Sequence, residues 1–88
     1  MNHAHSYPLL IAVTPLDGER SRLTFADGSE RILDERQITW RGTKPAGRPV
    51  LANYGLTWPE EVVELDGTPV AFDLGADEAY ELSQATSN

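Results

Sequence analysis

Apolar and polar residues alternate along short runs of this chain, and turn-forming residues separate the runs. The first run, residues 9–14, is rich in branched apolar side chains and has a proline on either side. This is typical of a β-strand that begins after Pro8 and ends before Pro15. Alternation then puts Leu9, Ile11 and Val13 on one face, and Leu10, Ala12 and Thr14 on the other.

Three Asp-Gly pairs follow or divide such runs. Both residue types tolerate the positive φ angles of tight hairpin turns, so the pairs predict the points at which an antiparallel sheet reverses. Their carboxylates are expected to serve turn geometry rather than catalysis. The pairs are Asp17-Gly18, Asp27-Gly28 and Asp66-Gly67.

The runs between the turns predict an antiparallel β-meander of about five strands. Residues 20–26 alternate between a face with arginine and a face with Leu23 and Phe25, as expected of a half-buried strand. A short fourth strand at residues 36–42 would put Ile38 and Trp40 on one face. The other runs are residues 29–35, 62–65 and 69–72, of which the last two form a hairpin.

Residues 73–84 change to a helical composition. Good helix formers predominate, and Asp77 and Glu78 come early, where the helix macrodipole favours negative charge. We therefore predict one helix over residues 76–84, followed by a tail at residues 85–88.

A second helical signal precedes the last hairpin. Thr57 and Pro59 fit the start of a helix, but the β-branched residues that follow limit it to a single turn. The expected fold class is α+β, with a small antiparallel meander and one short C-terminal helix. The 88 residues form a single domain with one thin core, and residues 1–6 are a polar tail.

Charge is unevenly distributed along the chain. The formal net charge is −7, and all 7 basic residues lie between Arg20 and Arg48. Residues 50–88 contain eight acidic residues and no lysine or arginine, so they carry −8, whereas residues 1–49 carry +1. Direct nucleic-acid binding is disfavoured, because affinity for phosphate needs clustered basic residues. The acidic half indicates either a basic protein partner or simple solubility.

Composition restricts the other classes. The chain has no cysteine, which excludes disulfides and thiolate metal sites. The opening run does not resemble a signal peptide, and no stretch approaches the roughly 20 apolar residues of a membrane span. We expect a cytoplasmic protein without a membrane anchor or cofactor. His3 and His5 are too weak a pair to predict a metal site.

No arrangement of residues predicts catalysis. The adjacent carboxylates Asp34-Glu35, Glu60-Glu61 and Asp77-Glu78 do not face one another, because neighbouring side chains diverge on strands and on helices. A serine nucleophile would need one of the two N-terminal histidines, and the chain has neither a phosphate-binding loop nor a nucleophile elbow. We assign no catalytic residue.

Aromatic and basic residues gather around a long loop at residues 42–55, and these residue types anchor protein interfaces. For Trp40 and Trp58, packing over a thin core is favoured over an interface role. The candidate partner-binding residues are Trp40, Arg41, Lys44, Arg48 and Tyr54 from this region, and Glu60, Glu61 and Glu64 from the acidic half.

Two segments resemble a known family. The stretch VTPLDGERSRLTFADGSERILD (residues 13–34) is similar to the opening of the bacterial family called domain of unknown function 2442, and VAFDLGADEAYELS (residues 70–83) is similar to its closing segment. The resemblance implies a compact α+β domain without assigned catalytic residues, some members being similar to accessory or antitoxin-like partners of small neighbouring proteins. The middle of the chain departs from the family pattern. The matching residues are Val13, Pro15, Leu16, Asp17, Gly18, Leu23, Phe25, Asp27, Gly28, Arg31, Asp34, Asp73, Leu74, Tyr80, Glu81 and Ser83.

The predicted function is a non-catalytic interaction or accessory module with a protein partner. One alternative is an acidic mimic of nucleic acid that inhibits a nuclease or a CRISPR-type complex, with residues 50–88 as the mimic surface. A small enzyme is the least favoured alternative. Exposed edge strands also leave a homodimer open.

Overall fold

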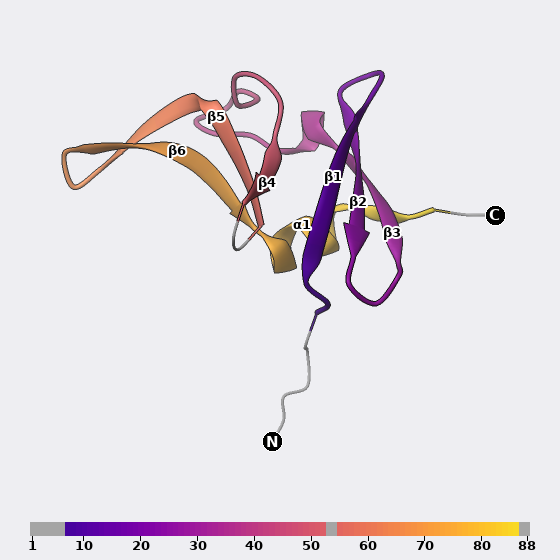
Figure 1. Cartoon of the computed structure of the whole chain (residues 1–88). Coiled ribbons are helices and arrows are strands. Elements are labelled where there is room, and N and C mark those ends of the chain that lie inside the picture. Colours follow the sequence, from indigo (N-terminus) through magenta and orange to yellow (C-terminus); the bar gives the residue numbers. More distant parts are fainter. Residues whose placement is uncertain (1–6, 53–54, 87–88) are drawn as a thin grey trace.

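The computed structural model describes residues 7–52 and 55–86, which form two antiparallel sheets and one α-helix (Figure 1). One sheet has the strand order β1-β2-β3-β7, and the other has the order β4-β5-β6. The α+β class is confirmed, but the described residues form seven strands in two sheets, not a single meander of about five. The elements are β1 (Leu10–Leu16), β2 (Arg20–Phe25), β3 (Glu30–Asp34), the 3₁₀-helix η1 (Glu35–Gln37), β4 (Val50–Ala52), β5 (Gly55–Leu65), β6 (Thr68–Gly75), α1 (Ala76–Leu82) and β7 (Gln84–Ala85).

The first two Asp-Gly pairs form the hairpin turns predicted for them. β1 pairs with β2 across Asp17-Gly18, and β2 pairs with β3 across Asp27-Gly28. Gly18 and Gly28 have φ angles of 74° and 89°, a region that costs glycine little. The Asp27 carboxylate accepts hydrogen bonds from the backbone N and the hydroxyl of Ser29, so it serves the turn.

β1 differs from its predicted form in two ways. It continues through Pro15, which an edge strand tolerates because its outer side needs no ladder donors. A register shift after Leu10 leaves Leu9 and Ile11 exposed, and it packs Leu10 and Val13 against the core. The predicted division of faces is therefore wrong, because the bulge interrupts strict alternation.

η1 occupies the start of the strand predicted at residues 36–42. The Asp34 carboxylate caps it by accepting a hydrogen bond of 3.0 Å from the backbone N of Arg36. Beyond η1, Ile38 is buried, and Trp40 forms an isolated bridge within a turn. The strand prediction is wrong because spacing alone does not separate a strand from an extended loop that sends the same side chains inward.

β5 has 11 residues and covers a segment predicted as a helical turn followed by a short strand. Its register against β6 shifts between Trp58 and Val62, so residues 59–61, the β5 bulge, leave the ladder. A bulge is a position at which a sheet accepts a proline, and Pro59 lies there. The predicted helical turn is therefore wrong. The third Asp-Gly pair makes the turn between β5 and β6, as predicted.

α1 ends at Leu82, before its predicted end at residue 84, because the chain then enters β7 and pairs with β3. Ala85, the first residue of the predicted tail, pairs with Arg31, so the prediction that the tail begins at residue 85 is wrong. The Arg31 guanidinium also donates to the Tyr80 carbonyl O at 3.0 Å and to Ser83 Oγ at 2.8 Å. These contacts join the two segments that carry the family resemblance.

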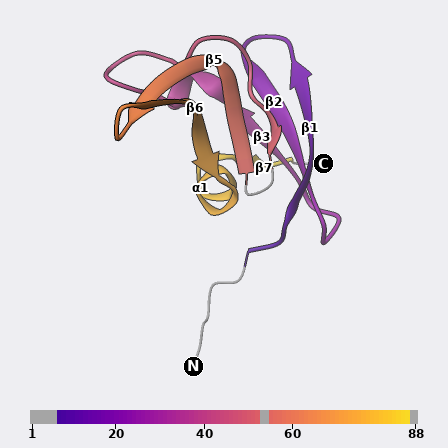
Figure 2. The same cartoon turned by 60° about the vertical axis from the view of Figure 1, so that its left-hand side comes forward.

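The core is one cluster of buried side chains from β2, β3, β5, β6 and α1, together with Ile38. Figure 2 shows α1 at the end of the β5–β6 hairpin, beside the sheet of β1–β3. Trp58 is the largest member of the core and is fully buried, and its indole Nε1 has no hydrogen-bond partner among the described residues. Packing therefore holds Trp58, which fits the expectation that bulk is needed in a thin core. The buried apolar residues are Leu23, Phe25, Leu33, Ile38, Leu56, Trp58, Leu74 and Ala79.

Candidate partner-binding site

A turn at residues 40–43 and the outer part of the β5–β6 hairpin border a hollow of about 460 Å³, which we call the Trp40 hollow. In Figure 1 the hairpin extends to the left, away from the sheet of β1, β2 and β3. Four residues predicted to bind a partner line the hollow: Trp40, Arg41, Glu61 and Glu64. The other lining residues are Thr43, Val62, Val63 and Pro69.

Trp40 is presented by a tight turn. Its backbone N donates to the Thr43 carbonyl O at 2.6 Å, and the Thr43 N donates to the Trp40 carbonyl O at 3.2 Å. Between them, Arg41 and Gly42 have φ angles of 55° and 84°, as in a type I′ turn. This conformation suits glycine but costs about 1 kcal/mol at Arg41. The turn therefore holds an arginine beside the hollow against its own backbone preference.

The Trp40 ring connects the hollow to the core. It is half-buried, and its centroid lies 5.5 Å from that of Phe72, which in turn lies 5.5 Å from the centroid of the buried Trp58. The Arg41 guanidinium lies 5.5 Å from the Trp40 centroid, within the range of a cation–π contact. Trp40 therefore packs on the core through one side and contributes to the wall of the hollow through the other.

The β5 bulge is supported from behind by the loop that follows the turn. Glu61 Oε1 accepts a hydrogen bond of 2.8 Å from the backbone N of Ala46, which fixes the position of this carboxylate. Glu60 lies against Gly47, where a Cβ would be 2.7 Å from Glu60 Cδ. A side chain at position 47 would displace the exposed Glu60 side chain, and the φ of 79° at Gly47 favours glycine there in any case.

Ion pairs in the described part of the chain do not neutralise its acidic second half, although Arg41 lines the same hollow as Glu61 and Glu64. Three ion pairs are recorded among residues 7–52 and 55–86, and each joins two residues that precede position 49. Among the described residues, the acidic side chains from Glu60 onward form no ion pair with lysine or arginine. One arginine and two glutamates line the Trp40 hollow, which leaves an excess of negative charge. The ion pairs are Arg36–Asp34 at 2.8 Å, Lys44–Glu19 at 3.5 Å and Arg48–Glu35 at 2.8 Å.

Arg48 is engaged by a buried carboxylate within the fold. Glu35 is fully buried and accepts hydrogen bonds from Ser21 Oγ at 2.5 Å, from Arg48 Nε at 2.8 Å and from Arg48 Nη2 at 2.9 Å. Arg48 Nη2 also donates to the carbonyl oxygens of Leu16 and Arg20. The bonds to Glu35 raise the pKa of Arg48 above its ordinary value. Arg48 therefore has an internal partner and does not line the Trp40 hollow.

The remaining candidates lie elsewhere. Lys44 pairs with Glu19, so its ammonium group is directed toward the β1–β2 turn. Glu60 is exposed on the β5 bulge but does not line the hollow. Tyr54 lies outside the described residues, as do His3 and His5. Partner roles for Lys44, Arg48, Glu60 and Tyr54 stay predictions.

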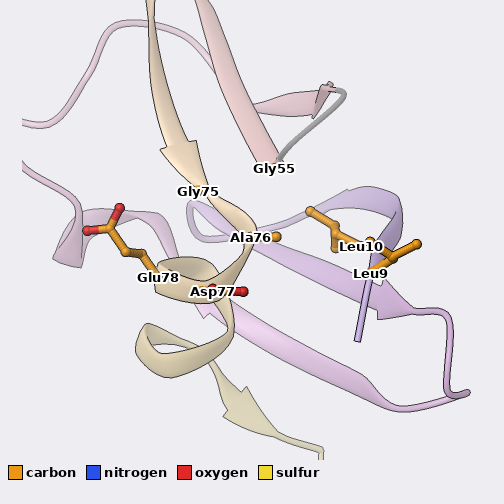
Figure 3. Close-up of a pocket in the computed structure, with 7 residues that line it drawn as sticks. All are labelled: Leu9, Leu10, Gly55, Gly75, Ala76, Asp77 and Glu78. Atoms are coloured by element: carbon orange, nitrogen blue, oxygen red, sulfur yellow. The ribbon is translucent and has the colours of Figure 1, made fainter. Parts of the chain in front are cut away.

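A second hollow, of about 480 Å³, lies between the start of β1 and the first turn of α1 (Figure 3). Leu9 and Leu10 border one side, and Asp77 and Glu78 border the other. The buried Gly55 also lines it, at a place where a Cβ would be 2.3 Å from a carbonyl O of β6. None of the predicted partner-binding residues lines this hollow, and we assign no ligand to it.

Comparisons with models of protein families, with curated proteins and with solved structures give no match. The resemblance to domain of unknown function 2442 therefore stays a prediction. In residues 7–52 and 55–86, no helix has the length and apolar character to cross a membrane. The same residues contain no group of three or more His, Cys, Asp or Glu side chains placed to hold a metal ion.

Sequence reasoning missed half of the hollow's lining. The hairpin predicted from residues 62–65 and 69–72 is observed, and in it Glu64 lies opposite Pro69. The sequence contains no signal that the turn at residues 40–43 lies across from this hairpin. That contact depends on Trp40 packing on Phe72, a long-range event that local patterns do not encode.

Proposed function

We propose that the protein is a non-catalytic interaction module that binds a basic protein partner at the Trp40 hollow. The observation that carries this proposal is the convergence of Trp40, Arg41, Glu61 and Glu64 around one hollow. Tryptophan and arginine are the residue types most often found at the energetic centres of interfaces. The fold supplies here a fixed aromatic wall, a strained arginine and two carboxylates.

The charge distribution supports a basic partner. Glu61 and Glu64 lie on β5, in a half of the chain whose described carboxylates make no ion pair with lysine or arginine. A lysine or arginine of the partner between these glutamates would gain two favourable interactions and would lie beside the Trp40 ring. Such a partner is also attracted from a distance by the net charge of −7.

The contacts of the adjacent carboxylates Asp34 and Glu35 support a role without catalysis. Asp34 is bound by Arg36, with hydrogen bonds of 2.9 and 2.8 Å to the guanidinium, and Glu35 is bound by Arg48. Each carboxylate therefore has its own arginine, and the two do not form a facing acid–base pair.

The test begins with capture of the partner from a lysate of the source cells, followed by titration of the purified partner against variants. The double variant Glu61→Gln/Glu64→Gln keeps side-chain shape, and the new amide at position 61 retains an oxygen that accepts from Ala46 N. We expect it to raise the dissociation constant about tenfold or more. Rising ionic strength should weaken binding of the native chain in the same direction.

Asp77→Asn/Glu78→Gln is the matched control, because it also removes two negative charges, but from the second hollow. The control should change the dissociation constant less than about threefold. Equal losses in the two double variants would show that net charge alone attracts the partner, and the proposal would be wrong. No loss in either would also exclude the Trp40 hollow as the site.

The same unpaired carboxylates support a second candidate function, mimicry of nucleic acid. Glu60, Glu61, Glu64 and Asp66 follow one another along the β5–β6 hairpin, as phosphates follow one another along a strand. In this case the partner would be a nucleic-acid-binding protein, and an oligonucleotide would displace the chain from it. A partner that keeps its affinity in excess oligonucleotide would exclude mimicry while leaving the interaction module intact.

A further inference from the structure

The outer part of the β5–β6 hairpin exposes apolar side chains on both of its faces. In this segment, residues 62–71, which we call the hairpin arm, Val63 pairs with Val70 and Leu65 pairs with Thr68. Cross-strand partners share a face and neighbours along a strand alternate, so Leu65 and Val70 lie on one face and Val62 on the other. Their exposed fractions are 62% for Val62, 63% for Leu65 and 37% for Val70.

The exposed apolar side chains of the hairpin arm do not belong to the buried core cluster. The part of the hairpin that packs on the core precedes the β5 bulge along β5. In this part, Trp58 pairs with Phe72 and Leu56 pairs with Leu74. The bulge separates this part from the arm, and Figure 1 shows the arm projecting beyond the body of the molecule. A two-stranded hairpin with neither face covered is marginally stable in water. Large apolar side chains on both faces of such an arm therefore indicate a surface that a partner covers.

The Trp40 hollow accounts for only part of the exposed apolar surface of the arm. Val62, Glu64 and Pro69 from one face and Val63 from the other line the hollow, whereas Leu65 and Val70 do not. A partner that filled the hollow and ended there would leave Leu65 and Val70 in water. Addition of a strand to β6 is also disfavoured, because Pro69 removes a donor from this edge strand.

We propose that the partner is a protein with a cleft that takes in the hairpin arm and contacts both faces at once. The walls of the cleft would be apolar opposite Val62, Leu65 and Val70. Its rim would carry lysine or arginine opposite Glu64 and Asp66, because neither carboxylate forms an ion pair with a lysine or arginine of the described residues. This inference rests on the proposed function and extends the site from the hollow to the whole arm.

Photocrosslinking from single positions tests the cleft. p-Benzoylphenylalanine is placed in turn at Thr43 in the hollow, at Leu65 on the opposite face of the arm, and at Ile11 on β1. Ile11 is the matched control, since it is an apolar side chain with an exposed fraction of 53% that lies far from the arm in sequence and sheet. We expect Thr43 and Leu65 to label one and the same protein, on peptides that contain lysine or arginine, and we expect no adduct from Ile11.

Affinity gives a second readout. Leu65→Ser should weaken binding of the purified partner about tenfold, because it removes an apolar side chain buried in the complex. Ile11→Ser should leave the affinity within about twofold. Both positions are exposed, so circular dichroism should show that both variants fold.

The outcomes separate this inference from the proposed function. An adduct from Thr43 without one from Leu65, together with an unchanged affinity for Leu65→Ser, would overturn the cleft and leave the hollow as the site. An adduct at twice the mass of the chain would identify a second copy as the occupant and would also overturn the proposal. The absence of an adduct from both Thr43 and Leu65 would count against the hollow and the cleft together.

Discussion

The Arg48 guanidinium donates to the buried Glu35 carboxylate from two nitrogens, at 2.8 and 2.9 Å. Glu35 lies at the end of the first sheet, and Arg48 lies 13 residues later, at the end of the loop that backs the β5 bulge. This pair therefore connects the sheet of β1–β3 to the wall of the Trp40 hollow. The pair does not line the hollow, but it holds the loop that contacts the β5 bulge.

Loss of the arginine should destabilise the fold. Arg48→Met leaves a buried carboxylate with Ser21 as its remaining side-chain partner. We expect a decrease of about 2 to 4 kcal/mol in the free energy of unfolding, because an uncompensated buried charge is costly and Arg48 itself is partly exposed. Chemical denaturation measures this change.

Arg36→Met is the control for Arg48→Met, since Arg36 pairs with Asp34 at the surface. Its cost should stay below about 1 kcal/mol. A similar small cost for Arg48→Met would mean that the Glu35 pair does not hold the loop in place.

Asp34 should make stability depend on pH in the acid range. The Arg36 guanidinium and backbone N hold the pKa of Asp34 at about 2, below its ordinary value of 3.8. Between these values the unfolded chain binds more protons than the folded chain, so this contribution to stability is present above pH 3.8 and is lost as the pH falls through 2. The comparison is urea denaturation of the native chain and of Asp34→Asn across this range.

The difference in stability between the native chain and Asp34→Asn should shrink as the pH falls. The amide oxygen that this substitution introduces still accepts from the Arg36 backbone N, so the cap of η1 is retained, while the charge and the oxygen that accepts from Arg36 Nη2 are removed. A difference that stays constant with pH would contradict the assigned pairing.

Gly55 should not accept a side chain. It has a φ of 150°, and a Cβ there would be 2.3 Å from the Leu74 carbonyl O, a backbone atom that has no room to move within the sheet. We expect Gly55→Ala to lower the free energy of unfolding by about 2 to 4 kcal/mol. Gly28→Ala should cost about 1 kcal/mol, because its φ is also positive but no atom lies within 4 Å of the added Cβ. Equal costs would contradict the close approach of β5 and β6.

Arg41 should affect binding more than stability. Arg41→Asn places a residue that tolerates positive φ in the turn, which offsets the loss of the contact with Trp40. The free energy of unfolding should therefore change by less than about 0.5 kcal/mol, while the dissociation constant of the partner rises about fivefold or more. Thermal unfolding and titration measure the two effects. A variant that binds as tightly as the native chain would remove Arg41 from the site.

Local chemistry explains which parts of this fold follow from the sequence. The Asp-Gly pairs predict their turns because positive φ is a property of the residues themselves, and Leu23 and Phe25 are buried as alternation predicts. The bulges in β1 and β5 cannot be derived in this way, since they depend on what packs across the sheet. The same holds for Glu35, whose burial makes sense only with Arg48 beside it.

The candidate site was predictable in its residue types but not in its geometry. Tryptophan, arginine and glutamate marked two regions of the sequence, and the structure brings one part of each region to the Trp40 hollow. It directs Lys44 and Arg48 to other acidic residues instead. Which of several basic side chains finds an internal partner depends on the tertiary fold, so composition alone does not separate binding residues from structural ones.

Hydrogen–deuterium exchange of the chain, alone and bound to its partner, tests the central claim most directly. The Trp40 hollow and the hairpin arm predict slower exchange at residues 40–43 and 61–71 in the complex, with little change in β1 and β2. Slower exchange confined to β1–β3 or to the hollow between β1 and α1, with residues 40–43 and 61–71 unchanged, would contradict the account.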